Sequence, residues 1–295
     1  MNIDKVEITH PDKMLFPKAR ISKKEVAEYY NKIAGFILPW INERPITLKC
    51  YPNGIDEDGF FIKHAPDYFP AFIQRVTVPL GKKNTTMEMV RINEAKDLVY
   101  LSEQNTIELH MPLAKTADIK KPDQIILDLD PSDDDFEKVR FTAFVLKEVL
   151  DSLQWPSFVK TTGSRGVHIH IPIKVYYSFH EVKAFAKQIA ERLHEECPDK
   201  TTIEQRKNKR GNKVFIDYLR NDYGMTAIAP YSLRALENAS IATPIDWSEL
   251  KDKAIGPQSY HLKNIFYRLA QKNDPWYNFQ QSAIAIQSKD ILDHW

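Results

Sequence analysis

The chain has 295 residues, of which 43% are apolar and 27% charged, and its formal net charge at pH 7 is +1. It can bury a large core as one domain or two lobes, its composition excludes a disordered chain, and its two isolated cysteines, Cys50 and Cys197, predict neither a disulfide framework nor a zinc site. No apolar run approaches the ~18 residues of a membrane span and no signal-peptide core is present, so we expect a cytoplasmic protein without a membrane partner.

The first half of the chain predicts one long helix followed by strands. The helix covers 21–41, because Ser22 and Glu25 have the spacing of a capping box and an apolar face follows. It should end or kink near Pro39. Four short strands follow, at 45–51, 60–64, 72–80 and 86–92. After them we expect a helical turn and a strand that ends near His110.

The second half mixes strands and helices without regular alternation. A strand that begins at Ile125 leads into a helix over 136–153, which carries apolar residues at helical spacing. We then expect a strand–turn–strand unit, a capped helix, two strands and a late helix, at 157–173, 178–196, 213–219, 226–233 and 261–271. This order favours an α+β fold over a doubly wound sheet, and the segment 110–123 could divide two lobes.

Two basic runs stand out in the otherwise neutral chain. One lies near the N-terminus, from Lys13 to Lys24, and the other is "RKNKRGNK" at 206–213. Such a run is usually a solvated face of the protein. Beside an acidic segment, the runs indicate instead that phosphates meet the basic groups while a metal ion meets the acids.

The acidic segment is "ILDLDP" at 126–131. Asp128 and Asp130 alternate along the expected strand, so they share one face while Leu127 and Leu129 turn toward the core. Two such charges repel each other, so the pair lies on a solvated face or holds a metal ion of the magnesium or manganese type. Asp217 in "VFIDYL" is the candidate for a third carboxylate, although alone it reads as a structural or surface acid.

The segment "TTGSRGVHIH" at 161–170 has two interpretations. Glycines flank Ser164 and Arg165, which would let backbone amides approach a phosphate, but an ordinary hairpin turn has the same composition. His168 and His170 share a strand face and could bind metal, or one could bind phosphate or pack in the core. His110 is equally ambiguous.

Three further residues are candidates for ligand contacts. Arg234 in "APYSLRA" suits bidentate recognition of a phosphate, although a surface ion pair is the ordinary role of such a residue. Phe60 and Phe61 are adjacent, so one should point inward and the other outward, where it could stack on a base. Packing of both rings between layers is the alternative.

Taken in order, these motifs form a pattern: "HPDKMLFP", "RPITLKCYPNGID", "GFFIKHAP", "NTIELHMP", "LDLDPSD", "TTGSRGVHIHIP", "GNKVFIDYLRN" and "TAIAPYSLRA". From about Ile8 to about Leu250 the chain resembles the polymerase domain of bacterial ligase D, a member of the archaeo-eukaryotic primase superfamily. The resemblance implies mixed and antiparallel sheets flanked by helices, with the active site between two lobes. It also implies a single primase-polymerase domain over 1–295, with an N-terminal lobe at 1–118 and a catalytic lobe at 119–295.

The resemblance also implies roles for single residues. The family's acids fall on Asp128, Asp130 and Asp217, which would hold two manganese or magnesium ions. Its contacts to the nucleotide fall on His110, Thr162, Ser164, Arg165, His168 and Arg234. Its 5′-phosphate lysines fall on Lys13 and Lys23, its template-stacking aromatics on Phe60 and Phe61, and a basic stretch near the active site on Arg210 and Lys213. Arg165 replaces a lysine common in the family, which keeps the charge but changes a point donor to a planar fork.

The implied function is template-dependent addition of NTP or dNTP substrates, with ribonucleotides preferred, at gaps and 3′-overhangs during non-homologous end joining. The implied partners are DNA with a 5′-phosphate, a Ku-type end-binding protein and a separate DNA ligase, on the nucleoid of a bacterium or archaeon. Two alternatives stay open. One is a metal-dependent phosphodiesterase built from the acids and "HIH", and the other is an inactive end-bridging module that uses Lys13 and Lys23.

Overall fold

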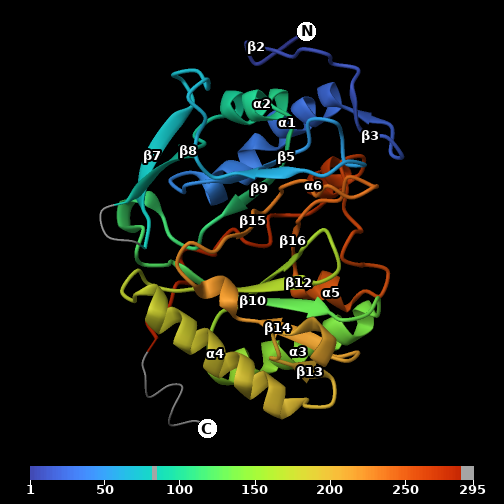
Figure 1. Ribbon diagram of the computed structural model, residues 1–295. Coiled ribbons are helices and arrows are strands. Elements are labelled where there is room, and N and C mark those ends of the chain that lie inside the picture. The colour runs from blue at the N-terminus through green and yellow to red at the C-terminus, as the bar shows by residue number, and fades with distance from the viewer. Residues whose placement is uncertain (82–84, 287–295) are drawn as a thin grey trace. The chain divides into compact units, whose positions relative to one another are not determined.

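The computed structural model describes residues 1–81 and 85–286, which form two compact units (Figure 1). Unit 1 contains Met1–Ala117, Thr226–Ala242 and Tyr260–Phe266, and unit 2 contains the other described residues. The first crossing between the units lies between Ala117 and Asp118. Two later segments return to unit 1, partly because strand β15 (Ala227–Ile228) pairs with β9 (Thr106–Met111), so the units are not continuous in sequence.

Unit 1 is built on a four-stranded antiparallel sheet in the order β15-β9-β5-β6. In this sheet, β5 spans Thr47–Cys50 and β6 spans Phe60–Ile62, and β6 forms one edge. Helices α1 (Lys23–Ile41) and α2 (Ala95–Glu103) pack against each other (Figure 1). Three two-stranded hairpins complete the unit: β1 with β2 (Asn2–Ile3, Val6–Glu7), β3 with β4 (Met14–Phe16, Ile21–Ser22) and β7 with β8 (Gln74–Pro79, Thr86–Arg91).

Helix α1 begins as the sequence predicts and runs past its proline. Ser22 and Glu25 form the expected capping box. The helix continues through Pro39 to Ile41, where the prediction was a stop or kink near Pro39. The buried face extends beyond the proline to Trp40 and Ile41, so the apolar contacts of this turn outweigh the loss of one backbone donor.

Unit 2 is built on a six-stranded sheet in the order β13-β14-β10-β12-β11-β16. Every pair is antiparallel except β13 with β14. The strands are β10 (Gln124–Pro131), β11 (Phe158–Thr161), β12 (Val167–Pro172), β13 (Thr201–Thr202), β14 (Val214–Asp217) and β16 (Pro244–Ile245). This mixed, largely antiparallel sheet with flanking helices confirms the α+β prediction.

Helices α3 (Phe136–Ser152) and α4 (Phe179–Glu196) both contact the central strand β10, below the sheet in Figure 1. Leu127 and Leu129 on that strand have no exposed surface, as the alternation in the sequence predicts. Because neighbouring residues of a strand point to opposite faces, Asp128 and Asp130, which alternate with these leucines, lie on the other face of the sheet.

Several short elements escaped the sequence patterns. Helix α5 (Trp247–Lys251) and strands β13 and β16 were not expected, and the strand expected at 226–233 contains only β15 before Tyr231 adopts a left-handed backbone with φ of 62°. The remaining elements are α6 (Ile265–Gln271) and three 3-10 turns at Thr116–Asp118, Lys207–Lys209 and Leu219–Asn221. Within the described residues, no helix combines the length and apolarity needed to cross a membrane.

Candidate functional site

Three carboxylates come together in unit 2 because of strand register. Asp128 on β10 lies directly opposite Asp217 on the antiparallel neighbour β14, and Asp130 follows two residues later on β10. Directly opposed residues and residues two apart share one face, so all three side chains emerge from the same side of the sheet. Asp128 is only 8% exposed, and the other two are partly buried, so this is not a freely solvated strand face.

The charges of these acids are strongly coupled. Burial alone would raise the pKa of Asp128, but His168, Arg220 and Lys160 outweigh it and lower this pKa to about 2. The pKa of Asp130 is raised by burial and by the charge of Asp128. The pKa of Asp217 is raised by the same two causes. Asp130 and Asp217 are therefore harder to ionise than Asp128.

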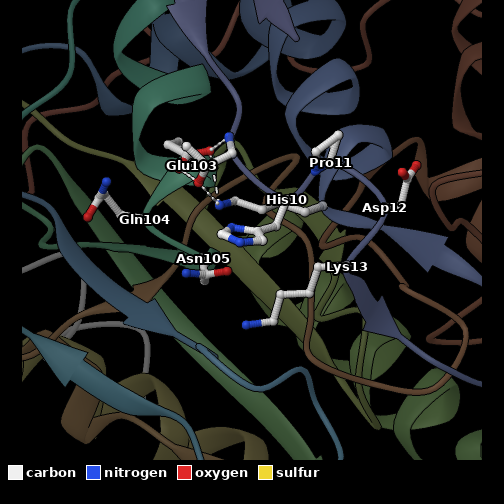
Figure 2. A pocket seen from close by; sticks show the side chains of 9 residues that line it. His10, Pro11, Asp12, Lys13, Glu103, Gln104 and Asn105 are labelled. Carbon is white, nitrogen blue, oxygen red and sulfur yellow. Dashed lines mark hydrogen bonds and ion pairs between the residues drawn. The ribbon is translucent and has the colours of Figure 1, made fainter.

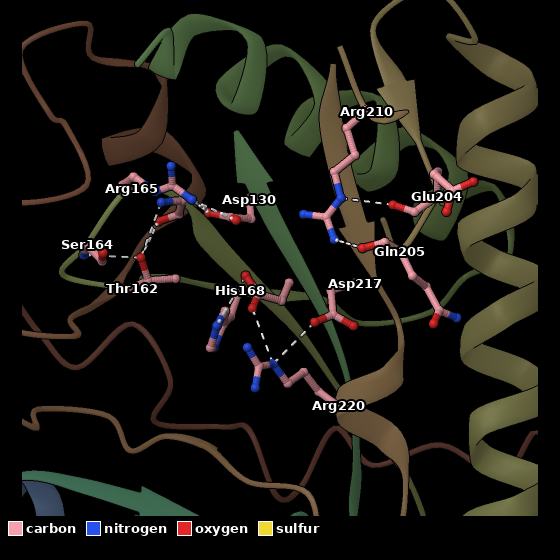
Figure 3. Close-up of polar contacts among 12 residues, drawn as sticks. Asp130, Thr162, Ser164, Arg165, His168, Glu204, Gln205, Arg210, Asp217 and Arg220 are labelled. Carbon is pink, nitrogen blue, oxygen red and sulfur yellow. Dashed lines mark hydrogen bonds and ion pairs between the residues drawn. The ribbon is translucent and has the colours of Figure 1, made fainter. Parts of the chain in front are cut away.

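Two guanidinium groups lie against the three carboxylates, and Figure 3 shows them beside Asp130 and Asp217. Arg165 Nη2 donates to both oxygens of Asp130, at 3.1 and 3.0 Å. Arg220 Nε lies 3.5 Å from Asp128 Oδ2 and 3.4 Å from Asp217 Oδ2. The sequence reasoning missed Arg220, although its place three residues after Asp217 in "DYLR" was a usable signal.

The donor chemistry of the cluster fits a divalent cation. Carboxylate oxygens are the hard ligands that magnesium and manganese prefer, and a cation would relieve the repulsion that raises the pKa values of Asp130 and Asp217. Over the described part of the chain, no three His, Cys, Asp or Glu side chains are arranged as a ready coordination set. Instead, Arg165 lies against Asp130, and Arg220 lies against Asp128 and Asp217.

The turn between β11 and β12 lies beside the acids. Its first residue after the strand, Thr162, accepts hydrogen bonds at Oγ1 from the amides of Ser164 and Gly166, both at 3.2 Å. A Cβ added to Gly166 would lie 2.0 Å from the carbonyl oxygen of Leu129, so only glycine fits there. Because two amides of the turn already have an internal acceptor, an incoming phosphate would be met chiefly by the side chain of Arg165.

The two histidines of "HIH" have different surroundings. His168 Nε2 lies 3.5 Å from Asp128 Oδ1, and burial lowers the pKa of His168 to about 4, so its ring is neutral at pH 7. His170 has no exposed surface, its Nδ1 lies 2.8 Å from Gln124 Oε1, and its ring centroid is 4.7 Å from that of Trp276. His168 therefore belongs to the acid cluster, whereas His170 is part of the core.

The basic stretch at 206–213 is tied to its own backbone. Arg210 donates to the carbonyl oxygens of Glu204 and Gln205 at 2.9 and 2.7 Å, and it stacks on Phe215 (Figure 3). Lys213 Nζ donates to the carbonyl oxygen of Pro198 at 2.8 Å. Both residues shape this loop, and the positive charge of Arg210 partly offsets the rise in the pKa values of Asp130 and Asp217.

In unit 1, a buried glutamate links two of the residues predicted to bind the nucleotide. Glu108 accepts from Arg234 Nε at 3.2 Å and lies 2.9 Å from His110 Nε2. Burial would raise the pKa of Glu108, but His110 and Arg234 outweigh it and lower this pKa to about 2. Burial also lowers the pKa of His110. The sequence reasoning missed Glu108, although "ELH" places it on the same strand face as His110.

The two adjacent phenylalanines of β6 are both accessible. Phe60 is 51% exposed and Phe61 is 55% exposed, so the expectation that one would point inward was wrong. The reason is that β6 is an edge strand with little covering either side. Phe61 meets the ring of His110 edge-on at 5.6 Å, and Lys49 Nζ lies 5.4 Å from the Phe61 ring centroid.

Lys13 and Lys23 line a third site, a cavity of about 700 Å³ in unit 1 (Figure 2). The other lining residues are Thr9, His10, Pro11, Asp12, Glu103, Gln104 and Asn105. Lys23 is 4% exposed, and its Nζ lies 3.0 Å from Glu103 Oε2. Lys13 Nζ donates to the carbonyl oxygen of Pro52. The structure thus brings the two predicted phosphate-binding lysines into one cavity.

Comparisons with known proteins identify relatives of the chain. The LigD multifunctional end-joining protein of Mycolicibacterium smegmatis is 31% identical over 280 residues, covering 92% of this chain and 35% of that protein. The bifunctional LigD of Bacillus subtilis is 30% identical over 280 residues, covering 94% of this chain and 44% of that protein. The chain therefore spans between a third and a half of the length of these relatives.

A solved structure is similar over nearly the whole chain. The polymerase domain from Mycobacterium tuberculosis ligase D, in complex with DNA, matches with a TM-score of 0.86 and 28% identity, covering 94% of this chain and 99% of that domain. The family model of the LigD primase-polymerase domain matches residues 22–276. The chain therefore belongs to the LigD primase-polymerase domain family.

Proposed function

We propose that the chain is a template-dependent nucleotidyltransferase that adds nucleotides to 3′ ends at DNA gaps and breaks. The observation that carries this proposal is the group of three coupled carboxylates on adjoining strands β10 and β14, in a chain of this family. The similar domain of Mycobacterium tuberculosis was solved with DNA, which supports DNA as the partner.

Asp128, Asp130 and Asp217 would hold two divalent cations, manganese or magnesium. Such ions, when bound, lower the pKa of an attacking hydroxyl and stabilise the charge on the transferred phosphoryl group. Arg165 is 47% exposed and can turn from Asp130 toward the phosphates of the nucleotide. The neutral ring of His168 holds a place beside Asp128, where it can accept or donate one hydrogen bond without adding charge.

Residues of unit 1 would bind the nucleotide and the DNA. His110 and Arg234, linked through Glu108, are the candidates for nucleotide contacts. Lys13 and Lys23 would receive the 5′-phosphate on the far side of a gap, and the exposed rings of Phe60 and Phe61 would stack on the template. A preference for ribonucleotides and cooperation with a Ku-type protein and a separate ligase complete the proposal.

The test is extension of a labelled primer across a short gap in duplex DNA. The reaction would contain manganese or magnesium and either ribo- or deoxyribonucleotides, and the downstream strand would carry a 5′-phosphate or a 5′-hydroxyl. We expect templated addition that requires the divalent ion, favours ribonucleotides and improves with the 5′-phosphate. Complete absence of addition under all of these conditions would contradict the proposal.

The two alternative functions predict different products. A phosphodiesterase would shorten the labelled strand, and the burial of His170 against Trp276 removes one of the metal ligands that such an enzyme would have used. An inactive bridging module would bind the 5′-phosphate without extending the primer. The cavity around Lys13 and Lys23 is complete within unit 1, which makes binding separable from catalysis.

A further inference from the structure

The cavity around Lys13 and Lys23 is not a simple basic pocket. Two lysines line it, but so do two carboxylates, Asp12 and Glu103. Glu103 lies close to Lys23, with the carboxylate Oε2 at 3.0 Å from the ammonium. The proposed phosphate site therefore contains a carboxylate, Glu103, that is already paired with one of its two lysines, Lys23.

Glu103 is held firmly in this position. Its Oε2 accepts from the amide of Thr9 at 3.0 Å, and its Oε1 accepts from the hydroxyl of Thr9 at 2.5 Å. Its side chain is 12% exposed and that of Lys23 is 4% exposed. A buried ammonium without a partner is strongly unfavourable, so Glu103 stabilises Lys23 when no phosphate is bound.

The helix ends make the pairing more significant. Lys23 is the first residue of α1, where the helix dipole favours an anion rather than a cation. Glu103 is the last residue of α2, where the dipole favours a cation rather than an anion. Each charge lies at the helix end that disfavours it, so each depends on the other, and the end of α1 itself would attract an incoming phosphate.

We propose that Glu103 is a resident counter-anion of the 5′-phosphate pocket, which neutralises Lys23 and weakens the pocket's hold on a terminal phosphate. This inference rests on the proposed 5′-phosphate function of the cavity. A phosphate that reaches Lys23 must share the ammonium with Glu103 and approach its negative charge. A weaker hold lets the DNA end leave the pocket after the gap is filled.

The test is equilibrium binding of gapped duplexes with a 5′-phosphate or a 5′-hydroxyl, followed by fluorescence anisotropy. Glu103→Gln keeps the shape of the side chain and removes its charge, so we expect roughly tenfold tighter binding of the 5′-phosphate duplex and slower dissociation. The gain should be smaller for the 5′-hydroxyl duplex, because electrostatic repulsion scales with the charge of the ligand and a terminal phosphate carries about −1.5 to −2.

The matched control is Glu28→Gln, which removes a carboxylate from the partly exposed pair with Lys24 on α1, the helix that carries Lys23. It should bind both duplexes as the wild type does. Unchanged or weaker binding of the 5′-phosphate duplex by Glu103→Gln would overturn the inference, because Glu103 would then only support the fold or Lys23. Thermal unfolding checks that the variant is folded, and Glu103→Ala, which also removes the charge, carries the test if the Gln variant does not fold.

Failure of the underlying function has a different signature. If the wild type binds the two duplexes equally and Lys23→Ala changes neither affinity, the cavity is not a 5′-phosphate site, and the role of Glu103 fails with it. If the wild type prefers the 5′-phosphate and Lys23→Ala abolishes the preference, the cavity is a 5′-phosphate site. The Glu103→Gln result alone then decides whether Glu103 weakens phosphate binding.

Discussion

The acid cluster of unit 2 and the lysine pocket of unit 1 solve the same electrostatic problem with opposite signs. In the cluster, guanidinium groups lie against carboxylates, and in the pocket a carboxylate lies against an ammonium. The partners differ in exposure: Arg165 and Arg220 are 47% and 37% exposed, whereas Glu103 is 12% exposed. The arginines can move into water when another cation arrives, but Glu103 must stay and share its partner.

The largest effect that this comparison predicts is on catalysis. Asp128→Asn removes the carboxylate that faces both Asp217 and Arg220, so nucleotide addition should fall by roughly a thousandfold or more, because a charge-stabilising metal ligand is lost. Single-turnover primer extension measures this fall. Asp133→Asn, which alters an acid that pairs with Lys138 outside the cluster, should retain activity. Equal activity of both variants would remove the acid cluster from the mechanism.

The next effect separates the buried ion pair of the lysine pocket from a more exposed ion pair on the same helix, α1. Lys23→Ala leaves the carboxylate of Glu103 with little compensation, so the free energy of unfolding should fall by about 3 kcal/mol. Lys24→Ala breaks an exposed pair at 3.8 Å and should cost less than about 1 kcal/mol. Urea denaturation of both variants provides the comparison. Similar small losses of stability in both variants would mean that Lys23 and Glu103 do not stabilise each other as a buried ion pair.

A smaller effect tests whether the arginines compete with metal. Arg220→Gln removes the cation that lies between Asp128 and Asp217, so these carboxylates should bind manganese roughly tenfold more tightly. Without metal, the variant should unfold at a lower temperature because the repulsion is unrelieved. Calorimetric titration with manganese measures the affinity, with Arg192→Gln on α4 as a control of equal charge. Weaker manganese binding by Arg220→Gln would show that Arg220 supports the site instead.

A further effect, on the pH dependence of stability, concerns Glu108, the buried acid of unit 1. Its pKa of about 2 lies below the ordinary value of 4.5, so its ionised form stabilises the folded state above about pH 4.5. That contribution should disappear as the pH falls toward 2. Glu108→Gln should therefore make the free energy of unfolding less dependent on pH between 4.5 and 2, as measured by urea denaturation across that range. An unchanged pH profile would show that Glu108 is not held ionised by Arg234 and His110.

Local patterns in the sequence predicted much of the fold and the membership of the acid cluster. Alternation placed Asp128 and Asp130 on one face, and the structure adds the register that brings Asp217 opposite Asp128. Register between strands far apart in sequence is a tertiary property, so no local pattern contained it. The same limit hid Glu103, whose hydrogen-bond partner Thr9 is 94 positions away in the chain. Glu108 and Arg220 each have one partner close in sequence, His110 and Asp217, but their second partners, Arg234 and Asp128, are remote.

The shortest elements were beyond sequence patterns for another reason. Strands β13 and β16 have two residues each, too few to show any periodicity. They exist because a neighbouring strand offers hydrogen-bond partners. The exposure of both Phe60 and Phe61 likewise depends on the edge position of β6, which is a feature of the whole sheet.

The most direct test of the account is titration of the wild type and of Asp128→Asn with manganese, in the presence and absence of a ribonucleoside triphosphate. We predict saturable binding by the wild type, strengthened by the triphosphate because the metal and Arg165 would both meet its phosphates, and loss of that binding in Asp128→Asn. Binding of equal strength by both proteins, or no binding by the wild type with the triphosphate present, would contradict the central claim that these carboxylates form a metal-dependent site of nucleotidyl transfer.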